Sequence, residues 1–298
     1  MDYQHLGKSG LKVSKIGFGC MSLKGAYADV EKTLHKAIDL GINFFDTADL
    51  YDKGQNEKWV GKALAHKRSN IIIATKVGNQ LRSNGSGWDW NPTKAYILTA
   101  VEASLKRLQT DYIDLYQLHG GTINDDIDDT IEAFELLKRQ GKIRHYGISS
   151  IRHNVIQAYV RKSYMVSVMM QYSLLDRRPE EIAFSLLQNN IIGVLARGTL
   201  AGGMLGSKSA TDYLAYTTEQ VAAAARAVKL FSGQQRRATQ TALQFVLNNA
   251  AVTSAIVGIR NNDQLEDAVS ALSAPPLTER EMEVLRQSIK INYYEQHR

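Results

Sequence analysis

Short apolar runs alternate with longer amphipathic stretches along most of the chain. The runs are continuously apolar, which is typical of parallel strands buried on both faces. The stretches between them carry apolar residues at helical spacing, for instance in residues 29–40, 92–108, 130–139 and 219–231. Eight apolar runs are found, at residues 15–17, 43–45, 71–75, 112–118, 145–148, 167–170, 193–196 and 254–257.

This alternation predicts an α/β protein whose parallel sheet closes into a (β/α)8 TIM barrel. An N-terminal β-hairpin is expected before the barrel, because residues 3–6 and 11–14 flank a glycine-containing turn. An extra C-terminal helix is expected over residues 278–289. No linker or change of composition divides the chain, and barrels commonly reach its length of 298 residues. Residues 1–298 are therefore expected to form a single domain.

Four polar residues of particular types lie at or just after the ends of successive runs. They are Asp46, Tyr51, Lys76 and His119. In a parallel barrel the carboxyl ends of the strands gather at one face, where active sites form. A free phenol titrates near ~10 and is a poor acid at neutral pH. A neighbouring ammonium stabilises the phenolate, which makes a tyrosine usable as a general acid.

The residue types suggest a division of labour in carbonyl reduction. Tyr51 would protonate a carbonyl oxygen, Lys76 would stand beside it, and Asp46 would keep that ammonium in place and charged. His119 would donate a hydrogen bond to the same oxygen. None of the four can donate a hydride, so a nicotinamide cofactor is implied. Each has an ordinary structural alternative when taken alone, but the four together favour a reductase site.

Longer connections between the predicted elements are candidates for shaping a pocket. Residues 77–91 are rich in Gly, Ser and Asn, and residues 198–218 contain several glycines. Long loops at the active face of a barrel usually contact substrate or cover a cofactor. Trp88, Trp90 and Tyr213 are candidates for such contacts, with packing of the loop onto the barrel as the alternative. The candidate substrate-pocket residues are Met21, Trp88 and Trp90.

Three strings at the strand ends resemble the signature of the aldo/keto reductase superfamily. They are GINFFDTADLY at residues 41–51, TK at 75–76 and QLH at 117–119. The resemblance covers nearly the whole chain and is greatest to the general aldo/keto reductases of Gram-positive bacteria. It implies a (β/α)8 barrel that acts as a monomer, NADPH across the barrel mouth, and the four residues above as a catalytic tetrad.

The cofactor residues implied by the resemblance are spread over several strand ends. No strand is followed by Gly-x-Gly-x-x-Gly, so a Rossmann site is excluded, and residues 17–19 (Gly-Phe-Gly) are expected to form a tight turn. Ser149 and Gln171 match the residues that bind the nicotinamide carboxamide. Gly258 and Arg260 precede a predicted helix. A helix N-terminus attracts phosphate and Arg adds bidentate contacts, so Arg260 is expected to bind the adenosine 2′-phosphate, favouring NADPH over NADH.

Some positions on the cofactor side differ from the family pattern. Arg197 stands where the family commonly has an aromatic residue that stacks on the nicotinamide ring. A guanidinium plane can also stack, or it could hold the pyrophosphate, and the sequence leaves both open. Gln264 and Asp267 resemble the residues on the adenine side. Ser150 and Ala268 replace residues that are usually Asn.

Composition adds limits to this interpretation. The chain has 36 Lys and Arg against 30 Asp and Glu, a formal charge of +6. The basic residues fall in pairs, such as those at 177–178 and 236–237, and form no long block, so a nucleic-acid partner is not expected. A mild positive excess suits an anionic dinucleotide equally well.

The remaining features predict a cytoplasmic protein without a metal. One cysteine, Cys20, allows no intramolecular disulfide, and no flanking base marks it as a nucleophile. The histidines lack metal-ligand spacing. Neither a signal segment nor an apolar run of membrane-spanning length is present, so no membrane association is expected.

The sequence therefore predicts NADPH-dependent reduction of aldehydes, and of some ketones, to alcohols, with Tyr51 as general acid. The alternative is a cofactor-binding regulatory or redox-sensing subunit with slow turnover, against which the intact tetrad argues. A barrel hydrolase or isomerase would need paired carboxylates, metal ligands or a nucleophile, for which there are no candidates.

Overall fold

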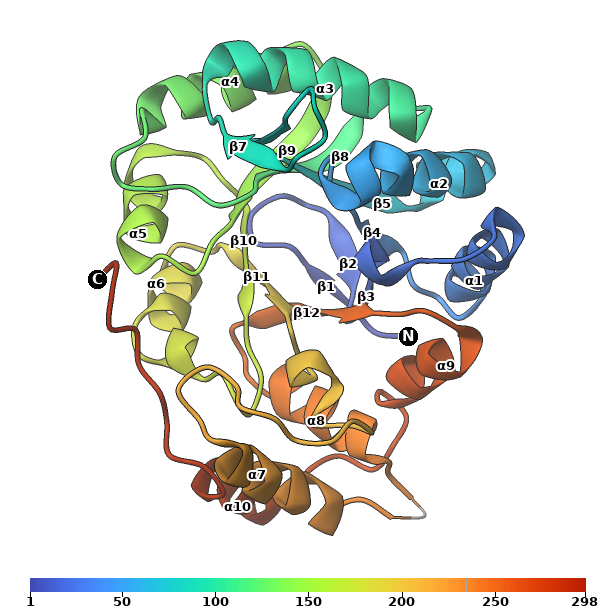
Figure 1. Cartoon of the computed structure of the whole chain (residues 1–298), viewed down its shortest axis with the longest axis vertical. Helices are drawn as coiled ribbons and strands as arrows, with labels where there is room; N and C mark the ends of the chain where they lie inside the picture. Colours follow the sequence, from blue (N-terminus) through green and yellow to red (C-terminus); the bar gives the residue numbers. More distant parts are fainter. Residues whose placement is uncertain (234) are drawn as a thin grey trace.

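The eight apolar runs form parallel strands that close into a barrel with helices around it (Figure 1). This computed structural model describes residues 1–233 and 235–298. The strands follow one another around the barrel in chain order, and the last pairs with the first. They are β3 (Ile16–Gly19), β4 (Phe44–Asp46), β5 (Ile72–Val77), β8 (Ile113–Leu118), β9 (Ile143–Ser149), β10 (Ser167–Gln171), β11 (Gly193–Arg197) and β12 (Val252–Gly258). The predicted TIM barrel is confirmed.

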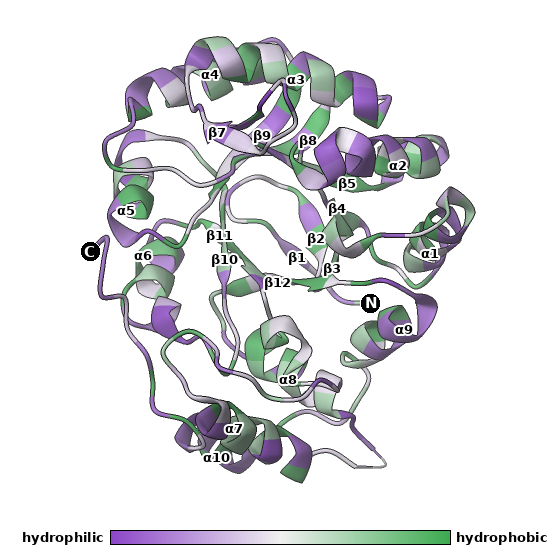
Figure 2. Ribbon diagram, in the orientation of Figure 1, coloured by the Kyte–Doolittle hydropathy of each residue, from purple (hydrophilic) through white to green (hydrophobic). Residues whose placement is uncertain are grey.

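Amphipathic helices cover the outside of the barrel, and their apolar faces turn toward the strands (Figure 2). One helix follows each strand: α1 (Tyr27–Asp39), α2 (Gln55–Leu64), α3 (Lys94–Leu108), α4 (Ile127–Arg139), α5 (His153–Lys162), α6 (Ala183–Asn189), α8 (Ala238–Leu247) and α9 (Asn262–Ser270). Short 3-10 helices are η1 (Cys20–Ser22), η2 (Tyr51–Gly54), η3 (Ala65–Asn70), η4 (Arg178–Glu180) and η5 (Ala201–Gly203). No helix in the described ranges is long and apolar enough to cross a bilayer.

Two further helices lie outside this ring. They are α7 (Thr218–Leu230) and α10 (Glu279–Gln287), and they pack against each other (Figure 1). The helix α10 is the predicted extra C-terminal helix. The connection between β11 and β12 contains both α7 and α8, so α7 is a second addition that helical periodicity alone does not distinguish from a barrel helix.

The predicted N-terminal hairpin is present and closes one end of the barrel. Its strands β1 (Tyr3–His5) and β2 (Lys12–Ser14) are antiparallel. Leu6 and Val13 from the hairpin are fully buried with side chains from inside the barrel. The barrel members of this cluster are Phe44, Ile72, Ala74, Leu115, Val166, Met169, Leu195 and Ile256. The hairpin reaches the amino end of β11, so the carboxyl ends of the strands remain open for a site.

The expected turn at residues 17–19 is wrong, because all three residues belong to the buried strand β3. Gly17 is needed there for space. A Cβ at this position would lie 2.6 Å from Ile256 Cδ1 and 2.9 Å from Phe44 Cδ1, inside the barrel. The glycine therefore reflects close packing of neighbouring strands.

The connection after β5 has more structure than the expected loop. Residues 77–91 contain an antiparallel pair, β6 (Asn79–Leu81) and β7 (Trp88–Trp90). Asn79 pairs with Trp90, which brings the far end of the connection back to the end of β5. A hairpin fixes the position of its side chains much more closely than an irregular loop does.

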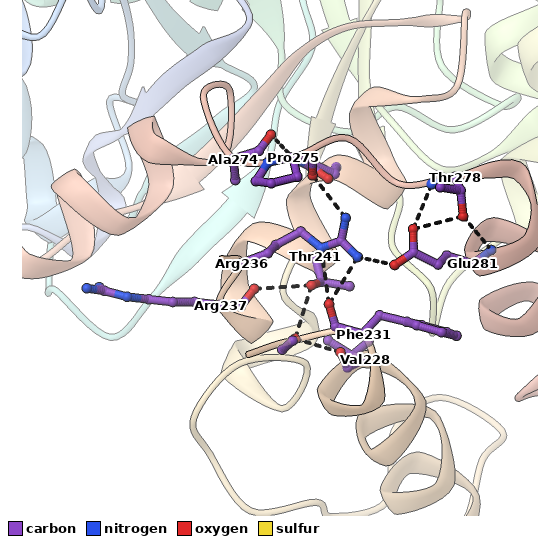
Figure 3. A network of polar contacts seen from close by, with 11 residues as sticks. Val228, Phe231, Arg236, Arg237, Thr241, Ala274, Pro275, Thr278 and Glu281 are labelled. Carbon is purple, nitrogen blue, oxygen red and sulfur yellow. Dashed lines mark hydrogen bonds and ion pairs between the residues drawn. The ribbon is translucent and has the colours of Figure 1, made fainter. Parts of the chain in front are cut away.

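A buried arginine joins the segments around α7, α8 and α10 (Figure 3). Arg236, one of the basic pair at residues 236–237, is only 7% exposed. Its guanidinium donates to Phe231 O at 3.0 and 3.2 Å and to Pro275 O at 2.9 Å. It also forms an ion pair with Glu281, which in turn caps α10 at Thr278. This arginine cluster connects the end of α7, the start of α8 and the first turn of α10.

Candidate active site

The four predicted tetrad residues all lie at the carboxyl ends of adjacent strands. Asp46 is the last residue of β4, Lys76 the last but one of β5, and His119 directly follows β8. Tyr51 begins η2, five residues after Asp46. Because β4, β5 and β8 are neighbours in the barrel, residues far apart in the chain meet at one rim.

Lys76 is the centre of this cluster and is completely buried. Its Nζ lies 2.7 Å from Asp46 Oδ2, 2.7 Å from Thr47 O and 3.3 Å from Tyr51 Oη. An ammonium has three donors, so one is directed at each partner. Burial lowers the pKa of Lys76, but Asp46 and Tyr51 more than offset this, and the pKa lies above its ordinary value. The side chain is therefore a charged donor beside the Tyr51 hydroxyl.

His119 stands against Tyr51 in a neutral form. The two ring centroids are 5.9 Å apart and the rings are nearly perpendicular, at 83°. Burial lowers the pKa of His119 to about 3, with further contributions from the charges of Lys76 and Arg197. A neutral imidazole has one N–H donor and one acceptor. His119 Nδ1 is buried without a hydrogen-bond partner in the described structure.

Gln117 belongs to the same cluster, although it was not among the predicted site residues. Its Nε2 donates to Asp46 Oδ1 at 3.3 Å, so both carboxylate oxygens of Asp46 are engaged. Asp46 is therefore a partner of two side chains and does not cap a helix. The signal was present in the sequence, because Gln117 and His119 are two residues apart and strand side chains repeat on one face every second residue.

Asn56, in the first turn of α2, holds the residue that follows β4 through a buried hydrogen bond. Its Oδ1 accepts a hydrogen bond from Thr47 Oγ1 at 2.6 Å, and its Nδ2 donates to Cys20 O at 2.8 Å. Thr47 is the residue whose carbonyl binds Lys76. Asn56 is 1% exposed, so these bonds are shielded from water. A polar residue on the buried face of an amphipathic helix is the sequence signal for such a support.

Glu57, the next residue, supports the end of β5. Its two carboxylate oxygens accept from Thr75 Oγ1 and Arg107 Nε, each at 2.6 Å. Asp49 is also buried here, and its Oδ1 has no hydrogen-bond partner in the described structure. Burial, together with the charge of Glu57, raises the pKa of Asp49 to about 7. In the described part of the chain, no three His, Cys, Asp or Glu side chains are grouped as metal ligands.

The residues expected at the nicotinamide lie along the same rim. Ser149, Gln171 and Arg197 are the last residues of β9, β10 and β11. Gln171 and Arg197 are register partners, and both lie near the half-buried Tyr213, whose pKa is raised by burial and lowered in part by these two groups. The Arg197 charge is close enough to lower the pKa of His119. The hydroxyl and carboxamide groups present here have the donors and acceptors that a nicotinamide carboxamide requires.

The segment expected at the adenosine phosphate forms the start of α9. Gly258 is the last residue of β12, and Arg260 is exposed just before the helix. Asn261 Oδ1 accepts from Gln264 N at 3.0 Å, and Gln264 Oε1 accepts from Arg260 N at 3.0 Å. Gln264 therefore shapes the loop that presents Arg260. A guanidinium beside a helix N-terminus has the charge and donors that suit a phosphate.

The next turn of α9 faces the barrel wall. Asp267 Oδ1 lies 3.4 Å from Arg237 Nη1 and 3.5 Å from Gln240 Nε2, so this carboxylate is already engaged by α8. Ala268 is fully buried in the apolar core. The two positions thus differ in their surroundings from the exposed Arg260.

Only one of the three candidate pocket residues lies against the strand-end cluster. The Trp90 ring packs on Gly78 and Gly120, which follow the ends of β5 and β8; a Cβ on Gly78 would be 2.7 Å from Trp90 Cζ3. Trp88 is 47% exposed on the same hairpin strand, and Met21 is 63% exposed in η1. The structure therefore places the Trp90 ring beside the ends of β5 and β8 and the other two side chains at the surface.

Comparison with known proteins identifies a family. The aldo/keto reductase family model matches residues 15–290. A protein of Bacillus subtilis named uncharacterized oxidoreductase YqkF is 48% identical over 307 aligned residues that cover all of both chains. L-galactose dehydrogenase from Arabidopsis thaliana is 31% identical and covers 92% of this chain and 88% of its own.

A solved structure agrees over the whole length. The holo form of aldo-keto reductase AKR11C1 from Bacillus halodurans covers 100% of this chain and 99% of its own, with 48% identity and a TM-score of 0.94. The apo form of that protein gives a TM-score of 0.85 at the same coverage. The backbone described here is thus closer to the holo form.

Proposed function

Because the chain belongs to the aldo/keto reductase family, we propose that it uses NADPH to reduce aldehydes, and some ketones, to alcohols. Tyr51 is the proposed general acid. The observation that carries the proposal is the Lys76 ammonium, which lies between the Asp46 carboxylate and the Tyr51 hydroxyl. The backbone similarity to a holo reductase supports a cofactor site at the barrel mouth.

The chain's own residues would supply the proton and the polarisation, while the bound nicotinamide supplies the hydride. Tyr51 transfers its hydroxyl proton to the carbonyl oxygen, and Lys76 stabilises the phenolate that this leaves. His119, which is neutral, donates a hydrogen bond to the same oxygen and orients it. Asp46 keeps Lys76 charged and fixed, and Gln117 holds the other oxygen of Asp46.

The proposal predicts that Tyr51→Phe abolishes turnover while cofactor binding persists. Removing a general acid typically costs about 10²- to 10⁴-fold in rate, and a phenyl ring keeps the packing against His119. We would measure aldehyde-dependent NADPH oxidation and, separately, the quenching of protein fluorescence by NADPH. Normal turnover in this variant would overturn the assignment of Tyr51. Binding without turnover in the unmodified protein would instead support the regulatory-subunit alternative.

We propose Ser149 and Gln171 as ligands of the nicotinamide carboxamide. Arg197 is proposed as a cofactor-binding cation that either stacks on the nicotinamide ring or holds the pyrophosphate. Arg260, supported by Gly258 and Gln264, is proposed to bind the adenosine 2′-phosphate. Asp267 is proposed to act through the ion pair with Arg237 that fixes α9 to α8.

We further propose that the single barrel domain works as a cytoplasmic monomer on small carbonyl substrates. Trp90 is the proposed wall of the substrate pocket, and Met21 and Trp88 lie at the outer edge of that pocket.

The proposal for Arg260 separates the two cofactors. Arg260→Ala should raise KM for NADPH about tenfold, since a charge-assisted contact contributes about 1.5–3 kcal/mol, and leave KM for NADH nearly unchanged because NADH has no 2′-phosphate. Steady-state kinetics with both cofactors at one aldehyde concentration would show this. Equal changes for both cofactors would remove Arg260 as the discriminating residue.

A further inference from the structure

A concave site lies on the outside of the barrel, between α1, α2 and α3. Its volume is about 690 Å³. Five cationic side chains line it, and no Asp or Glu is among its lining residues. The cations are Lys53, Lys58, Lys62, Lys106 and Arg107. We call this feature the cationic groove.

Basic residues that are scattered along the sequence lie together in the cationic groove. The whole chain has a net charge of only +6, and five positive charges surround this one groove. Arg107 is paired with Glu57 behind it, whereas none of the four lysines is within 4.0 Å of a carboxylate oxygen in the described structure. Lys58 and Lys62 are also one turn apart on α2, where like charges destabilise a helix. An anion in the groove would offset this repulsion.

Aromatic side chains accompany the cations. Trp59, which stands between Lys58 and Lys62 in the sequence, also lines the groove and is half-buried against the core. Lys62 Nζ already lies 4.0 Å from the centroid of the Tyr27 ring, which shows that a cation and an aromatic face can share this space. The volume falls within the roughly 300–1,000 Å³ of small-molecule sites. The groove therefore combines room for a flat ring with several point charges.

We propose that the cationic groove binds a small phosphorylated molecule with an aromatic ring, of the nucleoside diphosphate class. Lysine ammonium groups bind phosphate as point charges from several directions, and a base can lie against Trp59. A planar carboxylate would be matched better by a free guanidinium, but Arg107 donates its Nε to Glu57. The cationic groove is a site apart from the barrel mouth, because its residues come from the outer helices.

One residue connects this groove to the catalytic rim. Lys53 lies two residues after Tyr51, and both Asp52 and Lys53 have left-handed backbones, with φ of 47° and 51°. Such conformations are uncommon for residues other than glycine. They turn the chain directly after Tyr51 so that Lys53 lines the groove.

Calorimetric titration of ADP into the full-length protein tests the proposal. No dinucleotide is added, because NADP⁺ carries the same diphosphate and ring as ADP. The groove is identified as the ADP site that substitution of its lysines weakens, whereas an ADP site at the barrel mouth keeps its affinity in the same variant. We expect one further ADP site per chain, bound at least tenfold more weakly when salt is raised from 50 to 500 mM, about the range over which charge screening becomes strong. The double variant K58Q/K106Q should weaken ADP binding at least tenfold. Inorganic pyrophosphate should bind more weakly than ADP, because it lacks the ring.

A matched control separates a site from general electrostatics. K229Q/K290Q removes the same charge from two exposed lysines, one in the last turn of α7 and one just after α10, on the opposite side of the barrel (Figure 1). This control should leave ADP affinity within twofold of the unmodified protein. Equal weakening by both double variants, or no second ADP site at low salt, would overturn the proposal. Pyrophosphate binding as tightly as ADP would overturn the assignment to a nucleotide.

Discussion

Two buried cations in this molecule, Lys76 and Arg236, are each held by a carboxylate but differ in what else they touch. Arg236 donates to the backbone carbonyls of Phe231 and Pro275 as well as to Glu281 (Figure 3). Its partners are carbonyls and a carboxylate that join three segments of the fold. Lys76 donates to Asp46 and one carbonyl, and its third donor meets the hydroxyl of Tyr51.

The partners of the two cations distinguish a cation that holds segments of the fold together from one that also acts on a titratable group. A cation surrounded by backbone carbonyls and a carboxylate stabilises the arrangement of the segments that supply them. A cation with one donor on a titratable hydroxyl also stabilises the deprotonated form of that group. Replacing each cation by a hydrophobic residue of similar length should therefore affect different measurements.

The largest expected effect is the loss of activity in Lys76→Met. Without the ammonium Tyr51 becomes a poor acid, and we expect kcat to fall about 10³-fold, within the usual range for acid–base groups. Adding Asp46→Asn removes the carboxylate left unpaired by the first change, which should restore stability but not activity. Steady-state kinetics and urea unfolding of the single and double variants check both parts. Activity that recovers together with stability would make Lys76 a structural cation as well.

The next effect is on stability, in Arg236→Met. Breaking a buried pair by removing one partner costs about 3–5 kcal/mol, so the free energy of unfolding should fall by about 3 kcal/mol. At a temperature where the variant is folded, kcat should stay within about threefold, since an interaction outside the reacting centre adds little to transition-state stabilisation. Urea unfolding and kinetics at low temperature measure the two quantities. A loss of kcat equal to that of Lys76→Met would break the distinction.

A smaller effect concerns Asp49, a buried carboxyl whose Oδ1 has no partner in the described structure. Burial and Glu57 raise its pKa to about 7, against about 3.9 in an unfolded chain. The folded state then binds a proton that the unfolded state has released, so the stability from this group is full below pH 4 and is lost as pH rises to 7.

Asp49→Asn should therefore reduce the fall in stability between pH 5 and pH 8 by about 2.6 kcal/mol, at about 1.4 kcal/mol per pKa unit. Urea unfolding at the two pH values, for the variant and the unmodified protein, gives this difference. If the variant and the unmodified protein lose the same free energy of unfolding between the two pH values, Asp49 is ionised in the folded state, as Asp46 is beside Lys76.

The sequence predicted which side chains meet at the carboxyl ends of β4, β5 and β8. Asp46, Lys76 and His119 follow apolar runs, and the barrel brings such positions together whatever their separation in the chain. The strand β3 was partly misread, because a glycine required by close packing at Gly17 resembles one required by a turn.

Contacts between elements distant in sequence were not predictable in this way. Arg236 was noted only as part of a scattered basic pair, and only the folded chain shows Phe231, Pro275 and Glu281 around it. The cationic groove was missed for the same reason. Its lysines come from η2, α2 and α3, and they gather only when these helices pack. Asn56 and Glu57 were recognisable only as polar residues on a buried helix face.

The most direct test of the central claim is the absorbance of NADPH during incubation of the unmodified protein with small aldehydes at neutral pH. The site described here predicts a steady, aldehyde-dependent loss of NADPH absorbance, with a slower loss when NADH replaces NADPH. No loss with any aldehyde, under conditions where NADPH binding is measured independently, would contradict the claim that Lys76 and Tyr51 form a working acid.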